Sequence, residues 1–429
     1  MKIIHYTLGF EPNRSGGLVG YTTDLMNEQK AQGNKVIGLY PGGLNFINKS
    51  TYIKKDKIKA FESYQIINSL PLPLFGGIKE PKDFMNTIPK RVYERFLSEI
   101  SPDIIHIHTL MGIHQEFFEV AKEMDIPLVF TSHDYFGLAP EPTFFFDGES
   151  YDQSNTIEEW ITSSDQAMST KKLRIFQFKC YPLVRRIFQV LKKNSNNTKS
   201  GNNFSEINDR TIKDYGDLKS YYQNIFRKID MFHFNSTIAK EVYEKNIDID
   251  IKYKIMSITN CSVKNRSFNK KNDSKQVKVA YIGPREEFKG YFDFLSLAEE
   301  MSFNKKFEFH TYGHDTQVKD KNIMNHGRYS RYQLVDIYNN IDILVVPSKW
   351  KETFGLVVLE ALSHDTAVAV SKNVGAKDLL DESCVFESMT SLKSILINNN
   401  WQKPIGKLKT MDEHCKEILS TYLDIKNTR

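Results

Sequence analysis

The fold of this chain is decided by one stretch, residues 347–361, which reads PSKWKETFGLVVLEA. A β-branched run at residues 341–346 precedes it and is closed by the proline that opens the stretch. The first half of the stretch is therefore expected to be a strand end and a loop. The second half predicts a helix that starts near residues 354–355, so that Glu352 lies just before it and Glu360 about two turns along it.

The start of this helix is a candidate anion site, because the first backbone N–H groups of a helix have no partner within the helix. A loop carboxylate, an anion-binding helix start and an inward carboxylate together suit a sugar nucleotide. The sugar hydroxyls, the diphosphate and the ribose could each bind one of these three groups. The alternative is an ordinary strand, loop and helix with two surface glutamates, since two glutamates at a fixed spacing are common by chance.

The context Pro-Ser-x5-Phe-Gly-x4-Glu-Ala, which starts at Pro347, resembles the signature of the family 4 retaining glycosyltransferases of bacterial surface-polysaccharide type. The resemblance implies that Glu352 meets the donor sugar at the reacting centre and that Glu360 meets the ribose hydroxyls. It also implies that backbone amides between the two glutamates bind the diphosphate of the donor. The residues that would supply these amides are Thr353, Phe354, Gly355, Leu356 and Val357.

Length and composition favour a soluble protein of two domains, with three domains as the alternative. A chain of 429 residues is too long for one ordinary core, and its apolar fraction of 40% is typical of globular proteins. No run reaches the length of a membrane-spanning helix, and residues 1–6 predict a first strand rather than a secretory signal. The scattered cysteines lack metal-site spacing and fit a cytoplasmic protein with free thiols. They are Cys180, Cys261, Cys384 and Cys415.

Short apolar runs alternate with helical stretches twice along the chain, which predicts doubly wound α/β domains with parallel sheets. In the first 260 residues we expect strands at 2–6, 36–40, 103–108 and 127–131 and helices at 19–32 and 117–124. In the second half we expect strands at 277–282, 307–312, 341–346 and 367–371 and helices at 292–301 and 331–340.

This pattern and the resemblance imply the GT-B fold, in which two Rossmann-like domains face each other across a cleft. Residues 1–265 would be an acceptor-binding domain with a basic insertion near 150–203. Residues 275–405 would bind the nucleotide sugar, and a final helix within 406–429 would cross back onto the first domain.

Gly16 and Gly17 follow the first expected strand and precede a helix, where glycines allow backbone to approach a phosphate. The alternative is a tight turn without a ligand. The pattern is not the GxGxxG fingerprint, so a nicotinamide site is disfavoured. The resemblance implies that this loop faces the diphosphate and the acceptor.

Three histidines lie on expected strands or at their ends. His133 follows the strand at 127–131, at the carboxyl end where ligands of open α/β sheets bind. The segment His133-Asp134-Tyr135 resembles that of the same family, which implies a catalytic place for His133 beside the donor sugar; the alternative is a structural histidine. His106 and His108 share one face of a strand. They could form a metal pair, but a third ligand has no clear place, so packing and polar contacts are favoured.

The segment 283–290 follows the first strand of the second half and resembles the family's Gly-Arg and Lys-Gly elements, although Pro284 displaces the arginine by one position. The resemblance implies that Arg285 and Lys289 hold the diphosphate; the alternative is a solvated charged turn. These cations and the helix amides could neutralise the leaving group without a metal ion or other cofactor. The Asp-x-Asp at 248–250 is interpreted as incidental.

The net charge of +5 is concentrated in residues 171–193, which hold eight basic and no acidic residues. Apolar residues at helical spacing from Leu183 onward give this segment one basic and one apolar face. It is a candidate for peripheral contact with an anionic membrane surface, and the alternative is an inserted helix that packs on the first domain. Nucleic-acid binding is disfavoured, because no binding module accompanies the patch.

The leading hypothesis is a metal-independent retaining glycosyltransferase that moves a hexose-type sugar from a nucleotide-sugar donor. The acceptor would be a glycan or lipid-linked molecule in bacterial surface-polysaccharide synthesis. The alternatives are a GT-B sugar-nucleotide epimerase or phosphorylase and a non-catalytic partner of another transferase. The loop 373–378 departs from the Gly-Gly-Glu pattern of the family, so donor or acceptor binding is expected to differ there.

Overall fold

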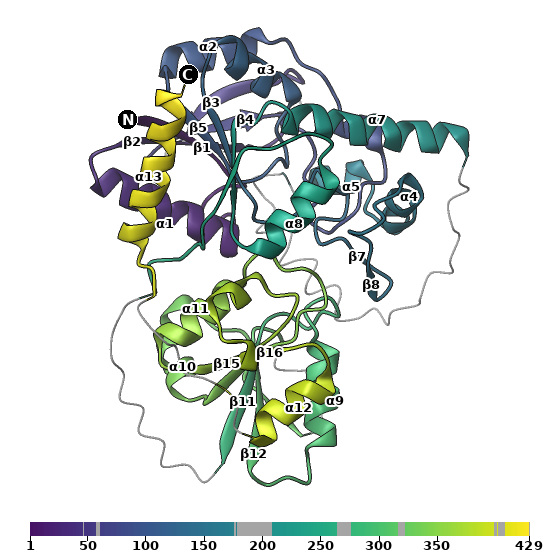
Figure 1. Cartoon of the computed structure of the whole chain (residues 1–429). Coiled ribbons are helices and arrows are strands. Elements are labelled where there is room, and N and C mark those ends of the chain that lie inside the picture. The colour runs from purple at the N-terminus through teal and green to yellow at the C-terminus, as the bar shows by residue number, and fades with distance from the viewer. Residues whose placement is uncertain are drawn as a thin grey trace.

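The computed structural model describes residues 1–45, 47–56, 61–175, 177, 208–263, 276–315, 322–398, 401 and 408–428. These residues form two α/β units, each built around a mainly parallel sheet, with the last helix lying on the first unit (Figure 1). The predicted α/β class with two Rossmann-like domains is confirmed.

The first unit contains an eight-stranded sheet in the order β10-β9-β6-β5-β1-β2-β4-β3, in which only the edge pair β3–β4 is antiparallel. Its central strands are buried almost throughout, because helices cover both faces of a parallel sheet. The strands are β1 (Lys2–Tyr6), β2 (Lys35–Pro41), β3 (Tyr52–Asp56), β4 (Glu62–Ile67), β5 (Ile104–Ile107), β6 (Leu128–Thr131), β9 (Met231–Phe234) and β10 (Tyr253–Ile255).

Helices and one small hairpin complete the first unit. The helices are α1 (Gly17–Ala31), η1 (Pro81–Phe84), α2 (Arg91–Ile100), α3 (Gln115–Glu123), α4 (Ile157–Ser164), α5 (Thr170–Ile175), α7 (Asp209–Phe226) and α8 (Thr237–Asn246). The hairpin joins β7 (Phe145–Phe146) to β8 (Glu149–Ser150).

The second unit contains an all-parallel sheet in the order β13-β12-β11-β14-β15-β16. Its strands are β11 (Val277–Ile282), β12 (Phe307–Tyr312), β13 (Ile323–Asn325), β14 (Ile343–Val346), β15 (Ala367–Ser371) and β16 (Val385–Phe386). Its helices are α9 (Tyr291–Glu300), η2 (Arg331–Gln333), α10 (Leu334–Asn339), α11 (Leu356–Ser363), η3 (Gly375–Leu379), η4 (Glu382–Cys384) and α12 (Met389–Asn398).

Several elements have no counterpart in the sequence-based expectation. Strands β3 and β4 and helix α2 fall where no element is expected. For β3 the reason is that its sequence YIKKD is short, charged and partly exposed at a sheet edge. The described residues between 140 and 177 hold the β7–β8 hairpin, α4 and α5. Helix α4 begins with a capping box formed by Thr156 and Glu159.

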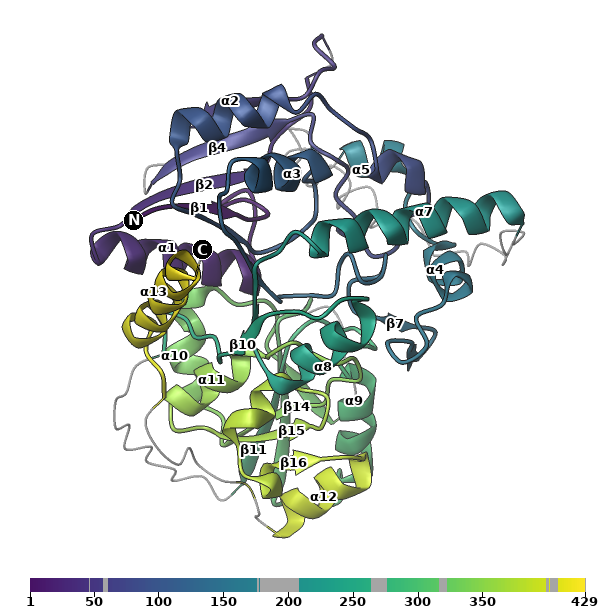
Figure 2. The ribbon, with the colours of Figure 1, turned by 45° about the horizontal axis from the view of Figure 1, so that its top comes forward.

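The last helix, α13 (Met411–Asn427), packs against α1 at the opposite end of the chain (Figures 1 and 2). The Tyr21 hydroxyl and Nε2 of His414 are hydrogen-bonded at 2.7 Å in this interface. Lys426 forms an ion pair of 2.6 Å with Asp103. Helix α13 therefore joins the apolar core at the junction between the two units.

Direct polar contacts hold the two units together. Thr237 at the start of α8 donates its backbone N–H and its hydroxyl to the carboxylate of Asp378 in η3, each over 2.7 Å. Lys351 forms an ion pair of 2.6 Å with the buried Asp152. These contacts bring the carboxyl ends of the two sheets toward one another.

Two expectations fall on residues that the structure does not fully describe. Of the basic segment 171–193, residues 171–175 and 177 are described and the rest, including the expected amphipathic helix, lies outside the described residues. Cys180 also lies outside them, whereas Cys261, Cys384 and Cys415 are described and are not part of a disulfide. Among the described residues, no helix is long and apolar enough to cross a membrane.

Candidate active site

A pocket of about 360 Å³ lies between the two units, where the loops before α1 and α11 meet. The first unit contributes Gly17, Leu18, His133, Asn235 and Ile258 to its lining. From the second unit, the residues of the expected site that line it are Lys289, Glu352, Thr353, Phe354, Gly355, Leu356 and Val357. The fold therefore brings together residues that are separated by more than half of the chain.

Two helix starts without side-chain caps face this pocket. Gly16 is the N-cap of α1 and Gly355 the N-cap of α11, and neither supplies a side chain to the first N–H groups. A Cβ atom on Gly17 would lie 3.7 Å from Cδ1 of Leu356, and one on Gly16 would meet nothing within 4 Å. Uncapped N–H groups and two helix dipoles give the pocket a positive potential that suits an anion.

Glu352 lies at the centre of a small polar cluster. Its carboxylate accepts hydrogen bonds from Nζ of Lys289 at 2.8 Å and from the Ser348 hydroxyl at 2.6 Å. Its backbone is held on both sides by the loop after β15, through Asn373 at 2.8 Å and Gly375 at 2.9 Å. The side chain of Glu352 is only 12% exposed, so its position and its negative charge are well defined within the pocket.

His133 follows β6 and faces the pocket from the first unit. Its Nε2 atom lies 3.3 Å from Nδ1 of His108, and its backbone carbonyl accepts a hydrogen bond of 3.0 Å from the Thr353 hydroxyl. The carbonyl of Thr353 in turn accepts one of 2.7 Å from Ser236. Burial lowers the pKa of His133 to about 3, and the ring of His233 contributes in the same direction. The imidazole is therefore neutral at pH 7.

Glu360 lies beside the pocket rather than in its lining. Its carboxylate accepts a hydrogen bond of 2.8 Å from Asn260 and one of 3.2 Å from the Tyr338 hydroxyl. Tyr329 links Glu360 to the pocket, because it lines the pocket and its phenol has a pKa raised to about 12 by burial and by the nearby Glu360 charge. A carboxylate has about four acceptor positions, so ligand hydroxyls can still bind Glu360.

Arg285 is not brought into the pocket. Its exposed guanidinium lies over the rings of Tyr291 and Phe292, with centroid distances of 5.3 and 5.0 Å. Pro284, which precedes it, does line the pocket. The arginine displaced by one position therefore points along α9, and Lys289 is the cation of this loop that reaches the pocket.

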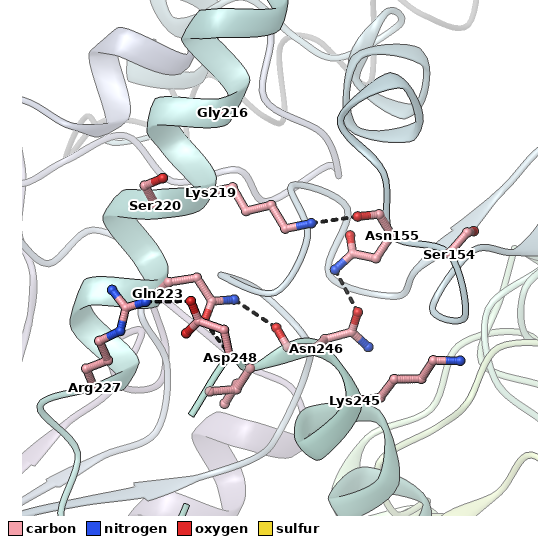
Figure 3. A pocket seen from close by; sticks show the side chains of 11 residues that line it. Ser154, Asn155, Gly216, Lys219, Ser220, Gln223, Arg227, Lys245, Asn246 and Asp248 are labelled. Carbon is pink, nitrogen blue, oxygen red and sulfur yellow. Dashed lines mark hydrogen bonds and ion pairs between the residues drawn. The ribbon is translucent and has the colours of Figure 1, made fainter. Parts of the chain in front are cut away.

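Asp248, the first carboxylate of the Asp-x-Asp at 248–250, lies elsewhere and lines a pocket of about 420 Å³ on the first unit (Figure 3). Asp248 pairs there with Arg227 at 2.5 Å. Lys219 and Lys245 also line this pocket, so its charged lining is mostly basic. None of its lining residues lines the pocket between the units.

Some pocket residues are absent from the sequence-based site. Ser348 and Asn235 each follow the carboxyl end of a parallel strand, which was the available signal for both. Tyr329 and Trp350 lie in loops whose sequence gives no comparable signal. His106 and His108 are buried and make the polar contacts that the sequence favours for them. The sequence offers no clear place for a third metal ligand, but the sheet places His5 beside the pair, with nitrogens of the three rings within 4.8 Å of one another.

Comparison with known proteins identifies two family models in the chain. Residues 15–188 match the model of Glycosyltransferase Family 4, and residues 263–383 match that of Glycosyl transferases group 1. Both matches include residues that line the pocket between the units.

Two curated relatives are uncharacterized proteins in the cps region of Klebsiella pneumoniae. One, of 42.6 kDa, is 22% identical over 302 residues, which cover 69% of this chain and 64% of the relative. The other, of 41.2 kDa, is 25% identical over 180 residues, which cover 37% of this chain and 49% of the relative. The chain thus spans about two thirds of one relative and half of the other.

Solved structures share the architecture over the whole chain at low identity. Sucrose-phosphate synthase from Thermosynechococcus elongatus has a TM-score of 0.59 at 14% identity, with 100% of both chains covered. A glycosyltransferase from Rickettsia africae has a TM-score of 0.57 at 12% identity, covering 100% of this chain and 99% of its own. Anabaena HepE in complex with UDP and glucose has a TM-score of 0.51 at 12% identity, covering 100% and 98%. The shared fold is GT-B.

Proposed function

The chain belongs to the family 4 glycosyltransferases of GT-B fold, and we propose that it transfers a hexose-type sugar from a nucleotide-sugar donor with retention of configuration and without a metal ion. The acceptor would be a glycan or lipid-linked molecule in the synthesis of a bacterial surface polysaccharide. The cps-region relatives from Klebsiella support this setting.

The observation that carries the proposal is the convergence of two uncapped helix starts, Lys289 and Glu352 on one pocket. The N–H groups that follow Gly355 suit the diphosphate, and Lys289 adds a full positive charge beside it. Glu352 and His133 flank the same space and suit the hydroxyl groups of a sugar. Because HepE is recorded with UDP and glucose, UDP-glucose is the first donor to test.

The transfer step breaks the bond between the anomeric carbon and the diphosphate oxygen, and the electron pair leaves with the diphosphate. The acceptor hydroxyl oxygen forms the new bond on the same face of the sugar, and its proton passes to the departing phosphate oxygen. Positive charge from Lys289 and the helix starts stabilises the leaving group as its negative charge grows. The negative carboxylate of Glu352 stabilises the positive charge that develops on the sugar.

The lining of the pocket supports a reaction without a metal ion and with retention. Among the described residues that line it, Glu352 is the only carboxylate, and Lys289 already neutralises it. Divalent ions such as Mg²⁺ bind best to several oxygen ligands. An inverting transferase needs a general base that takes the proton of the acceptor hydroxyl. The low pKa of His133 makes its ring a weak base, so it is poorly suited to that role.

A larger pocket on the first unit supports an anionic acceptor. It has a volume of about 860 Å³ and is lined by Lys49, Arg91, Lys171 and Arg174, with no carboxylate among its described lining residues. Such a lining suits a phosphate group of a lipid-linked glycan. The membrane contact expected of residues 171–193 stays a prediction.

The proposal is tested by incubating the purified protein with a panel of sugar nucleotides, with and without a lipid-linked acceptor, and measuring nucleoside diphosphate release in EDTA. Acceptor-dependent release from one donor, together with an α-linked product from an α-donor by NMR, is the expected result. Loss of activity in EDTA that Mg²⁺ restores would contradict the metal-free mechanism. Conversion of a donor without any acceptor would instead indicate an epimerase.

A further inference from the structure

A continuous chain of buried hydrogen-bonding groups runs through the first unit and ends at the pocket. It begins at the backbone carbonyl of Met256, just after β10, and ends at the ring of His133. Every side chain between them is fully or almost fully buried. In order from Met256 these side chains are His233, Thr131, His106, Tyr422, Gln29, His5 and His108.

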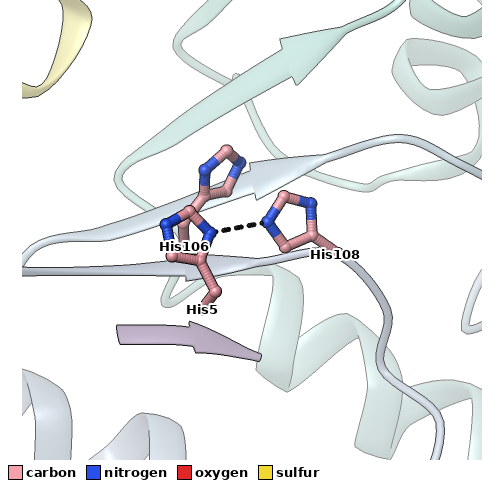
Figure 4. A group of neighbouring side chains, drawn as sticks. All are labelled: His5, His106 and His108. Carbon is pink, nitrogen blue, oxygen red and sulfur yellow. Dashed lines mark hydrogen bonds between the residues drawn. The ribbon is translucent and has the colours of Figure 1, made fainter. Parts of the chain in front are cut away.

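The parallel sheet places these groups side by side. His5 on β1 is the register partner of His106 on β5, and Thr131 on β6 is the partner of His233 on β9. Figure 4 shows the rings of His5, His106 and His108 gathered over the strands. The relay, meaning this set of groups from Met256 to His133, therefore follows from strand order and not from sequence proximity.

The histidines of the relay are neutral at pH 7. Burial lowers the pKa of His5 and of His233 to about 4 and lowers those of His106 and His108 well below the usual range. Each neutral imidazole has one nitrogen that donates a hydrogen bond and one that accepts. Fixing the direction of one hydrogen bond therefore fixes the direction of the next.

The Met256 end fixes the direction, because a backbone carbonyl can only accept. Nε2 of His233 must donate to it over 2.7 Å, which leaves Nδ1 to accept from the Thr131 hydroxyl over 2.9 Å. The Thr131 oxygen then accepts from Nε2 of His106 over 2.6 Å. Nδ1 of His106 consequently accepts from the Tyr422 hydroxyl over 2.5 Å.

The same logic carries the direction to the pocket. The Tyr422 oxygen accepts from the amide nitrogen of Gln29 over 3.4 Å, so the amide oxygen of Gln29 accepts from Nε2 of His5 over 2.7 Å. Nδ1 of His5 accepts from Nε2 of His108 over 3.0 Å. Nδ1 of His108 then accepts from Nε2 of His133 over 3.3 Å, so the proton of the His133 ring is on Nε2.

We propose that the relay holds His133 as the tautomer protonated on Nε2, so that Nδ1 accepts a hydrogen bond from a hydroxyl group of the donor sugar. The identity of this ligand rests on the proposed function, whereas the tautomer rests on the relay alone. Gln29, His5 and His108 are then positioning residues, because they act on the sugar only through His133.

A metal ion on His5, His106 and His108 is the competing interpretation of the same cluster. Both ring nitrogens of His5 and of His106 already have hydrogen-bond partners, at distances between 2.5 and 3.0 Å. A metal ion would take one nitrogen from each ring and interrupt the relay. The observations favour the relay, and metal content separates the two interpretations.

The direct test is nitrogen NMR of the full chain labelled with ¹⁵N-histidine, because protonated and unprotonated ring nitrogens differ widely in chemical shift. The resonances of His133 are assigned by their loss in His133→Asn. The expected result is a protonated Nε2 and an unprotonated Nδ1. Protonation on Nδ1, an even mixture of tautomers, or stoichiometric metal by elemental analysis would overturn the proposal.

Two variants at the middle of the relay test its effect on the pocket. Gln29→Leu removes the hydrogen-bond acceptor of His5. The nitrogen chemical shifts of His133 are then expected to move toward those of a mixture of the two tautomers, and sugar-nucleotide binding is expected to weaken about five- to tenfold. Gln29→Asn keeps a neutral amide with the same kinds of donor and acceptor, and both properties are expected to lie closer to the wild-type values than in Gln29→Leu. Gln223→Leu makes the same substitution at a buried glutamine outside the relay and is the control.

Binding of the nucleoside diphosphate alone separates this proposal from the proposed function. It should be unchanged in Gln29→Leu, because the diphosphate site does not include His133. Failure of the wild type to bind any nucleoside diphosphate, with the expected tautomer present, would overturn the proposed function and leave the relay intact. Unchanged His133 shifts in a folded Gln29→Leu variant would overturn the relay.

Discussion

Nζ of Lys289 lies 2.8 Å from Oε1 of Glu352, although the two residues are 63 positions apart and belong to different loops of the second unit. Both line the pocket between the units, and the lysine also lies over the ring of Trp350. The pair keeps a cation and an anion in the pocket while neither is left unpaired. A bound diphosphate adds a second partner for the lysine, and a bound sugar adds one for the glutamate.

Replacing Lys289 by Met is expected to weaken nucleoside diphosphate binding by about 10- to 150-fold, since a hydrogen bond to a charged group contributes about 1.5–3 kcal/mol. Isothermal titration calorimetry measures this change. Lys349→Met is the matched control, because Lys349 pairs with Glu287 and Asp293 outside the pocket lining. Equal affinity of the Lys289 variant and the wild type would exclude the lysine from the diphosphate site.

Replacing Glu352 by Gln keeps the shape of the side chain and removes its charge. We expect sugar transfer to fall by at least about 100-fold while nucleoside diphosphate binding changes little, because the charge acts on the sugar in the transition state. Turnover and binding are measured on the same preparation. Glu287→Gln, at an exposed glutamate, is the control variant. An equal loss of binding and turnover in Glu352→Gln would argue for a structural role of Glu352.

Gly375 allows the two units to approach at the pocket. A Cβ atom at this position would clash with the Ser236 hydroxyl and with the Thr353 carbonyl, which are themselves hydrogen-bonded across the units. Gly375→Ala is therefore expected to lower kcat/KM through an altered position of Thr353 and to cost about 1–3 kcal/mol of unfolding free energy.

The control for this prediction is Gly216→Ala in α7, where an added Cβ meets nothing within 4 Å. It should leave activity unchanged and stabilise the protein slightly, because alanine favours helix over glycine. Full activity in Gly375→Ala would show that the close approach of the units is not needed for transfer.

The sequence predicts the parts of the site that depend on local signals. The glycine at 355, the apolar run that follows it and the two glutamates define the start of α11 without any tertiary information. Lys289 was assigned to the donor site from its loop, but its ion pair with Glu352 was not, because pairing across two loops depends on the order of the strands.

The relay shows why the remaining features could not be predicted. Its histidines lie on β1, β5 and β9 and in the loops after β5 and β6. The sequence predicts a site role only for His133, and it favours packing and polar contacts for His106 and His108. Only the register of β1 with β5 and of β6 with β9 places His5 beside His106 and Thr131 beside His233. Tyr422 reaches the relay from the far end of the chain, because α13 returns to the first unit.

The buried histidines predict that stability falls as the solution becomes more acidic. Burial lowers the pKa of His5 and His233 to about 4 and that of His133 to about 3, whereas histidines of an unfolded chain titrate near pH 6.5. Below about pH 6.5 the unfolded chain therefore binds more protons than the folded chain, and its free energy falls relative to the folded state. The stability is fully present above about pH 6.5 and is lost as the pH falls toward 4 and below.

Urea unfolding followed by circular dichroism from about pH 7.5 to pH 4.5 measures this dependence, with a slope that reports the protons taken up on unfolding. His114→Gln supplies an internal comparison, because burial, with the charge of Arg174 adding to it, lowers the pKa of His114 to about 3 and His114 lies outside the relay. At low pH, the plot of unfolding free energy against pH should have a smaller slope for this variant than for the wild type, corresponding to about one proton fewer taken up on unfolding. A flat profile for the wild type would mean that the rings are hydrated or charged in the folded protein, which the directed relay does not allow.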